Sequence, residues 1–201
     1  EAMLPNKDTT EEKENKIKEN FFKILKSAYG AIETKSVIQK ELLTRKNDEE
    51  KKCVIITYMG TFKKMRARFS IMLDVTKGNQ PYFIDMRCSP LDYSRIPFFS
   101  NISGLVLEYI RDKNISELVD EAGSDFQKRM VSKKKLQKSL AVINCDSLTQ
   151  FTSNLILQGE LTYARVVYDM MDTDKYLALI FVSEDNKFKL YDLGFINKKK
   201  E

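Results

Sequence analysis

The sequence of 201 residues contains no histidine. Histidine is the usual general base near neutral pH, the usual partner of serine and cysteine nucleophiles, and the commonest metal ligand. Phosphate-binding loops are also missing, because the seven glycines never fall into a G-x-G-x-x-G or Walker arrangement. We therefore expect a protein that is not an enzyme, and we assign no catalytic, cofactor-binding or metal-ligating residue and no cofactor.

Cysteines and long apolar runs are scarce. Cys53, Cys88 and Cys145 match no zinc or redox spacing, and their odd number leaves at least one of them unpaired. Cys53 and Cys145 adjoin apolar residues, which predicts that both are small buried side chains. No apolar run approaches the roughly 20 residues of a membrane-spanning helix. We therefore expect neither a disulfide framework nor a transmembrane segment.

Two acidic clusters, 169–174 and 184–185, raise the question of calcium binding. An EF-hand loop needs a central glycine and a distal glutamate at fixed positions, and neither cluster has them. We interpret both clusters as turns.

The basic residues are mostly lysine and lie among many acidic residues. Of 34 basic residues only 8 are arginine, and 29 acidic residues bring the net charge to +5. Lysine is chiefly a solubilising charge, whereas arginine suits bidentate phosphate recognition, so nucleic-acid binding is disfavoured. The most basic segment contains Lys63, Lys64, Arg66 and Arg68. It predicts either a charged outer strand face that prevents edge pairing, which we favour, or a surface for acidic protein, anionic lipid or nucleic acid.

The first fifty residues have the spacing of amphipathic helices. Thr9 or Thr10 is the expected cap, and the expected apolar face comprises Ile17, Phe21, Ile24, Leu25 and Ala28. Gly30 is expected to interrupt this helix. A second helical piece is predicted over Ile32–Leu43, ending near a charged turn at Lys46–Lys52.

Strand patterns follow. Cys53–Tyr58, Phe62–Leu73 and Pro81–Cys88 predict an antiparallel meander, with a bulge at Gly60 and a turn at Lys77–Asn79.

The second half repeats the order of helices before strands. Ile102, Leu105, Val106, Tyr109 and Ile110 share one predicted helix face. A helix restarts after Asn114 and ends at Gly123, and a basic helix with a solvated Lys133–Lys135 face spans Phe126–Leu140. The predicted strands are Leu155–Leu157, Leu161–Asp169, Tyr176–Ser183 and Phe188–Phe195, whereas Ser147–Asn154 is ambiguous.

Helices followed by strands indicate the α+β class. We expect two domains, residues 1–95 and 96–201, with a single domain built on one shared core as the alternative.

Asp85 and Asp169 are candidates for lone functional carboxylates if a sheet curls around a cavity. We favour solvent-facing positions for both. Sheet packing is likewise the favoured role of the tyrosines at 58, 82, 163, 168 and 191.

The order of elements from Asn101 to Ile196 resembles the NTF2-like fold, also called SnoaL-like. Leu105–Ile110, Ile115–Val119, Gly159–Asp169, Tyr176–Ser183 and Lys187–Phe195 carry the resemblance. It implies a curved antiparallel sheet wrapped on helices as a cone, whose cavity is an active site in some members and a scaffold in others. Catalytic members use histidine with aspartate, and this sequence has no histidine. The resemblance therefore implies a non-catalytic member.

The lysine-, asparagine- and isoleucine-rich composition without tryptophan resembles proteins of AT-rich bacteria, including spirochaetes, many of them envelope-associated. We expect a non-catalytic protein–protein interaction module of a bacterial cell-envelope or periplasmic protein, with the cytoplasm as the alternative location. The expected partner is another protein, which includes membrane-associated proteins. A second copy of the chain, in a homodimer, is also expected as a partner. The alternative is a small-ligand pocket, or weak lyase or isomerase chemistry, in the cone. A cavity filled by Phe126, Tyr163, Phe181 and Phe195 would exclude that alternative.

Overall fold

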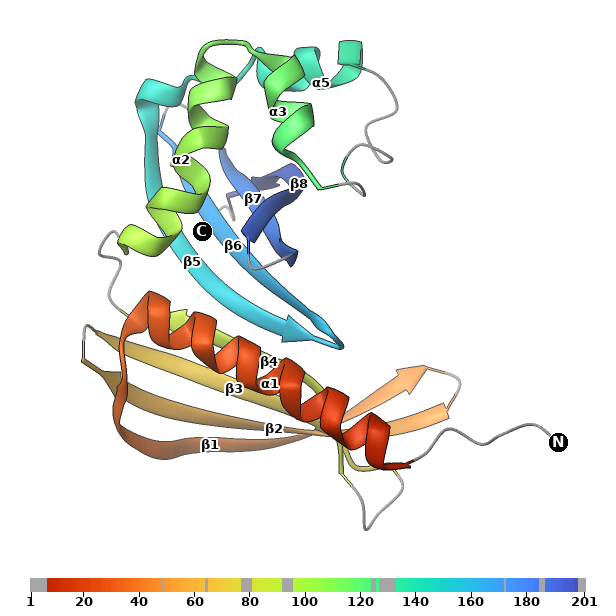
Figure 1. The fold of residues 1–201 in the computed structure, drawn as a ribbon. Coiled ribbons are helices and arrows are strands. Elements are labelled where there is room, and N and C mark those ends of the chain that lie inside the picture. The colour runs from red at the N-terminus through yellow and green to blue at the C-terminus, as the bar shows by residue number, and fades with distance from the viewer. Residues whose placement is uncertain are drawn as a thin grey trace, which may run out of the picture. The chain divides into compact units, whose positions relative to one another are not determined.

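The computed structural model describes residues 7–47, 49–63, 65–76, 81–91, 96–123, 126, 133–171, 173–184 and 187–198. Helices accompany an open sheet of eight strands, which follow one another from β1 to β8 in sequence order (Figure 1). The strand pairings β1–β2, β2–β3, β6–β7 and β7–β8 are antiparallel, which confirms the α+β class.

The chain forms two compact units. The first contains Glu1–Cys88 and Leu157–Thr162, and the second contains Ser89–Ile156 and Tyr163–Glu201. The elements of the first half are α1 (Lys7–Tyr29), β1 (Ile32–Asn47), β2 (Glu49–Phe62), β3 (Arg66–Asp74) and β4 (Tyr82–Pro90). The expected meander is therefore present, whereas its Lys77–Asn79 turn lies outside the described residues.

Helix α1 lies across one face of the first four strands (Figure 1). Phe21, Leu25 and Ala28 are buried as expected, and Ile17 and Ile24 are half-buried. The helix ends as predicted: Gly30 takes a φ of 86° and donates its N–H to the Lys26 carbonyl at 2.9 Å. The predicted cap is wrong, because Thr9 and Thr10 lie inside a helix that is already formed at Lys7.

The predicted second helix at Ile32–Leu43 is wrong: this segment is strand β1. Its pairing with β2 shifts register between Ile32 and Thr34 and again between Val37 and Gln39. Each shift adds an unpaired residue and breaks the alternation that identifies a strand, so the apolar spacing imitates a helix. The expected charged turn is also shorter than predicted, because β1 ends at Asn47 and β2 begins at Glu49.

Gly60 is not a bulge, because it pairs in regular register with Lys35 on one side and Ala67 on the other. Its role is steric. A β-carbon at this position would lie 2.9 Å from Cε2 of Phe69 and 3.3 Å from Cε2 of Phe62. These two rings lie 5.3 Å apart, and Phe62 in turn contacts Tyr29 of α1. Glycine therefore makes room for the aromatic core of the first unit.

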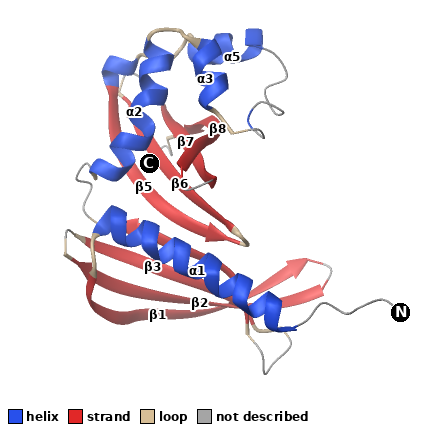
Figure 2. Cartoon of the chain, in the orientation of Figure 1, coloured by secondary structure: helices blue, strands red, loops and turns tan. Residues whose placement is uncertain are grey.

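The second half contains α2 (Pro97–Arg111), α3 (Ile115–Glu121), α5 (Lys133–Leu140) and the short 3-10 helix η1 (Cys145–Ser147). Four strands follow them (Figure 2): β5 (Leu148–Gln158), β6 (Leu161–Met170), β7 (Lys175–Glu184) and β8 (Lys187–Asn197). The four predicted strands are confirmed, and the ambiguous 147–154 segment belongs mostly to β5. The Lys133–Lys135 side chains and most of 124–132 lie outside the described residues.

Helix α2 packs on the strands through Phe99, Ser103, Val106 and Ile110, all buried. Leu105 is not on this face, as its side chain is 45% exposed. Asn114 precedes α3 as predicted, and its Oδ1 accepts a hydrogen bond from the Glu117 N–H at 3.4 Å. Each half of the chain thus consists of helix followed by a four-stranded antiparallel meander.

Candidate binding surfaces

The two aspartates singled out from the sequence lie in different units. Asp85 on β4 is in the first unit, 3.9 Å from a guanidinium nitrogen of Arg87. Asp169 on β6 is in the second, with its Oδ1 2.6 Å from the Lys198 Nζ. Each carboxylate therefore faces a cation within its own unit.

Asp169 belongs to a cluster that we call the aromatic platform, formed by Phe151, Asp169, Tyr176 and Lys198. The rings of Phe151 and Tyr176 stack with centroids 4.7 Å apart and planes inclined by 20°. The Lys198 Nζ lies 5.5 Å from the centre of the Tyr176 ring and donates to the Met170 carbonyl at 3.3 Å. The lysine is thus held at one time by a carboxylate, a carbonyl and an aromatic ring.

Strand register brings these residues together. Asp169 on β6 pairs directly with Tyr176 on β7, which pairs with Ile196 on β8. Directly opposite residues of antiparallel strands point to the same face. The neighbouring pair, Tyr168 with Leu177, points to the other face, where both side chains are buried and Tyr168 contacts α2. The platform therefore lies on the face turned away from α2.

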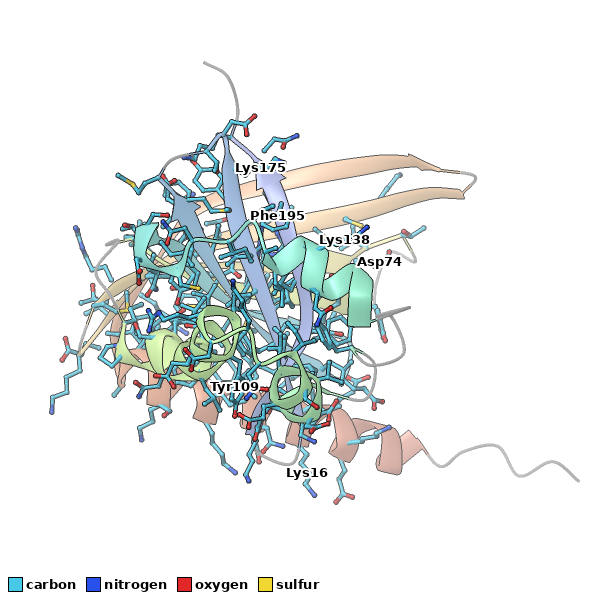
Figure 3. All side chains as sticks on the ribbon, turned by 90° about the horizontal axis from the view of Figure 1, so that it is seen from above. Lys16, Asp74, Tyr109, Lys138, Lys175 and Phe195 are labelled. Atoms are coloured by element: carbon cyan, nitrogen blue, oxygen red, sulfur yellow. The ribbon has the colours of Figure 1, made fainter. Side chains whose placement is uncertain are left out.

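The platform is partly open to solvent. Phe151 is 40% exposed, and Met171, which directly follows the last residue of β6, is 63% exposed. Figure 3 labels Lys175, the first residue of β7 and the neighbour of Tyr176. Exposed aromatic and methionine side chains are enriched at protein interfaces.

Most of the other tyrosines fill the sheet, as the sequence predicted. Tyr163 and Tyr191 meet edge to face at 5.4 Å, and the buried Tyr168 hydroxyl lies 2.6 Å from the Ser103 hydroxyl. Tyr58 is half-buried opposite Phe69. Tyr82 differs, because it is 66% exposed.

The basic segment forms what we call the arginine face, made up of Arg66 and Arg68 on β3 and Arg87 on β4. Ala67 and Phe69 are buried on the α1 side, so the alternating Arg66 and Arg68 point to the opposite side, where both are exposed. Cys88 on β4 is buried beside Tyr29 of α1, whose hydroxyl donates to the Cys88 carbonyl. Because neighbouring residues of a strand point to opposite faces, Arg87 points to the outer side, as Arg66 and Arg68 do. Lys63 is exposed beside this face, and Lys64 lies outside the described residues.

The four aromatic residues that would exclude the small-ligand alternative by filling one cavity do not share a cavity. Phe126 and Phe181 are buried. Tyr163, however, pairs with Val182 while Phe181 pairs with Ala164, so Tyr163 and Phe181 point to opposite faces of the strands. Phe195, labelled in Figure 3, pairs with Leu177 and shares the face of Phe181. Alternation along β6 and β7 thus rules out one cavity lined by all four.

A small cleft lies in the first unit. Residues of α1, Tyr82 and Phe83 of β4, and Glu160 line it, and its volume is about 180 Å³. Binding sites for drug-sized molecules usually measure about 300–1,000 Å³. The Lys13 Nζ lies 2.7 Å from the Glu160 Oε1, so two of the lining side chains neutralise each other.

The cysteines are free thiols: Cys53 and Cys88 are buried and Cys145 is half-buried. Burial raises the pKa of the Cys88 thiol, and it also raises the pKa of Cys145. A raised pKa keeps a thiol protonated and weakly nucleophilic at neutral pH.

Two features are absent from the described residues. No group of three or more histidine, cysteine, aspartate or glutamate residues in them could hold a metal ion. No helix within the same ranges is both long and apolar enough to cross a bilayer.

Comparison with protein-family models, curated proteins and solved structures found no match. The resemblance to NTF2-like proteins therefore stays a prediction.

Sequence reasoning missed Phe151, Tyr176 and Lys198 as members of one site. Phe151 lies in the segment Ser147–Asn154, whose polar pattern is ambiguous, and Lys198 lies in the charged tail. One signal was available: a lone aromatic residue in a polar strand is a candidate for an exposed contact. Its partners could not be found without the strand register.

Proposed function

We propose that this chain is a non-catalytic protein–protein interaction module of a bacterial cell-envelope protein, and that it binds its partner through the aromatic platform. The observation that carries the proposal is the stacked Phe151–Tyr176 pair, in which Phe151 is 40% exposed and Tyr176 half-buried, beside an ion pair. The envelope location rests on the composition of the chain alone. A second copy of the chain is one of the partners that the experiment below distinguishes.

The chemistry of the platform suits a protein partner. Tyrosine, phenylalanine and methionine are enriched at protein interfaces, because they offer large apolar area at a low cost in side-chain entropy. Stacking fixes both rings before binding, and Lys198 is held by Asp169. Such pre-organisation reduces the entropy lost on association.

For the second half we infer an NTF2-like cone. The order α2, α3, α5 and then β5–β8 supports it, as does the hydroxyl contact between Ser103 and Tyr168 that joins α2 to the strands. The small-ligand alternative has less support. The described cleft of about 180 Å³ lies in the first unit, and Asp169 is engaged by Lys198.

The test is affinity capture from a bacterial envelope extract with three baits: the wild-type chain, a Phe151→Ala/Tyr176→Ala variant and a Leu105→Ala/Val142→Ala variant. The control removes two exposed apolar side chains of the same unit that are 45% and 65% exposed. We expect a protein that the wild-type and control baits retain after a high-salt wash and that the platform variant loses.

Three results would contradict the proposal. One is equal capture by all three baits, and another is the absence of any protein retained after the high-salt wash. The third is turnover of ester, thioester or hydroxyacyl substrates that Asp169→Asn or Asp85→Asn abolishes, because it would restore the enzymatic alternative. Sedimentation of the purified chain shows whether the retained partner is a second copy.

A further inference from the structure

We propose that the arginine face of the first unit is a second docking surface, for an extended acidic segment of another protein with carboxylates at alternate positions. The surface lies in a different unit from the aromatic platform. Binding at one surface can therefore be tested independently of binding at the other.

The arginine face has cations that the described residues do not neutralise. Within the described ranges neither Arg66 nor Arg68 forms an ion pair with a carboxylate, and both are exposed. Arg87 is 58% exposed, and its 3.9 Å separation from Asp85 is at the long limit for an ion pair. Each guanidinium therefore keeps a free planar fork for a carboxylate.

The spacing of these cations fits an extended ligand. Arg66 and Arg68 are two residues apart on one strand, so their side chains repeat at about 7 Å. Alternate side chains of any extended peptide repeat at the same distance. A segment with Asp or Glu at every second position therefore places one carboxylate opposite each arginine of β3, and it can reach Arg87 on the neighbouring β4.

The composition of the face favours carboxylates over phosphates. Asp85 shares the outer side of β4 with Arg87, two residues away, and is 15% exposed. A continuous phosphate backbone along the face would meet this negative charge, whereas a peptide can place a neutral residue there. Single-stranded nucleic acids also need aromatic stacking surfaces, and the residues directly opposite Arg66 and Arg68 are Thr61 and Met59.

The test uses a fluorescent peptide of alternating glutamate and threonine, with binding followed by anisotropy at low salt. Wild type is compared with Arg66→Gln/Arg68→Gln/Arg87→Gln and with a control, Lys16→Gln/Lys23→Gln/Lys26→Gln. The control removes the same charge from exposed positions on α1, where Figure 3 labels Lys16. Oligothymidylate and vesicles of phosphatidylglycerol are the phosphate probes, and melting curves verify that each variant folds.

We expect the arginine variant to bind the peptide at least about tenfold more weakly, and the control to change by less than about twofold. Asp85→Asn should bind the peptide about two- to threefold more tightly, because it removes a negative charge that would repel the carboxylates of the peptide. This second variant keeps the proposal testable if the triple variant does not fold. A role of Asp85 in folding alone would not strengthen binding.

Equal weakening by both triple variants, or no binding of the peptide to wild type, would overturn the proposal. Tighter binding to oligothymidylate or to the vesicles than to the peptide would contradict the claim that the arginine face binds carboxylates in preference to phosphates. The Phe151→Ala/Tyr176→Ala variant should bind the peptide as wild type does, so failure of the platform and failure of the arginine face give different results.

Discussion

The hydroxyl groups of Ser103 on α2 and Tyr168 on β6 lie 2.6 Å apart inside the second unit. Ser103 is fully buried, and its Oγ also donates to the Phe99 carbonyl at 2.7 Å. This polar contact fixes α2 at one position along β6, whereas apolar packing alone would tolerate sliding. The contact places Tyr168 on the face of the strands that α2 covers, so the adjacent Asp169 lies on the face that carries the aromatic platform.

We expect Tyr168→Phe to lower the free energy of unfolding by about 1 kcal/mol, and Ser103→Ala by about 1–2 kcal/mol, because each removes a buried hydrogen-bonding group. The double variant should lose less than the sum of the two. Urea denaturation of the four proteins measures this coupling. Strictly additive losses would show that the two hydroxyls do not interact.

Gly60→Ala should destabilise the protein by about 1–3 kcal/mol, because the new methyl group would lie 2.9 Å from the Phe69 ring. Gly104→Ala is the matched control. Gly104 lies in the middle of α2, where a β-carbon meets nothing within 4 Å. There alanine should stabilise by about 0.5–1 kcal/mol, since it lowers the entropy of the unfolded chain. Thermal melting of the two variants checks the opposite signs, and a stabilised Gly60→Ala would contradict the packing.

Stability should fall in alkali through Tyr29 and Cys88. Burial raises the pKa of both groups above their ordinary values of 10.0 and 9.0. Between the pKa of each group in the unfolded chain and its raised pKa in the folded chain, the folded protein keeps a proton that the unfolded chain has lost. The contribution of the two groups to the free energy of unfolding is therefore fully present below about pH 8.5. Above that pH it declines by up to about 1.4 kcal/mol per pH unit for each group.

Denaturation curves between about pH 8 and about pH 11 measure this decline. Tyr29→Phe and Cys88→Ala should each make it shallower. An unchanged slope in the double variant would mean that neither group carries the effect.

Native thiol labelling should proceed in a fixed order. Cys145 is half-buried, with its Sγ 3.6 Å from the Leu107 carbonyl, whereas Cys53 and Cys88 are buried. A thiol reagent at pH 8 should therefore modify Cys145 first, although more slowly than a free thiol because its pKa is raised. Mass spectrometry of digests identifies the modified residue. Faster modification of Cys88 would contradict its burial beside Tyr29.

Regular patterns allowed much of the fold to be predicted. The 3.6-residue period of α1 and the alternation in β6 each gave the correct element, because Phe21, Leu25 and Ala28 are buried on one side of the helix and every second residue of β6 is buried. Strand β1 was missed for a physical reason: two register shifts break its alternation. Tertiary pairing with β2 decides its conformation, and a local pattern cannot report that pairing.

The candidate sites were predictable to different degrees. Arg66 and Arg68 are two residues apart on one strand, so alternation alone indicated a shared cationic face. The aromatic platform needs β5, β6, β7 and the segment after β8 to align. Phe151 and Tyr176 are distant in sequence, and only the strand register brings their rings to 4.7 Å.

The central claim is that the aromatic platform binds a protein partner, and calorimetric titration of the captured and purified partner tests it most directly. The titration compares wild type with the Phe151→Ala/Tyr176→Ala and Leu105→Ala/Val142→Ala variants. We expect the platform variant to bind at least about thirtyfold more weakly, as loss of an interface hot spot implies, and the control to remain within about threefold of wild type. Equal affinity of all three proteins, or weakening by the control variant alone, would contradict the account.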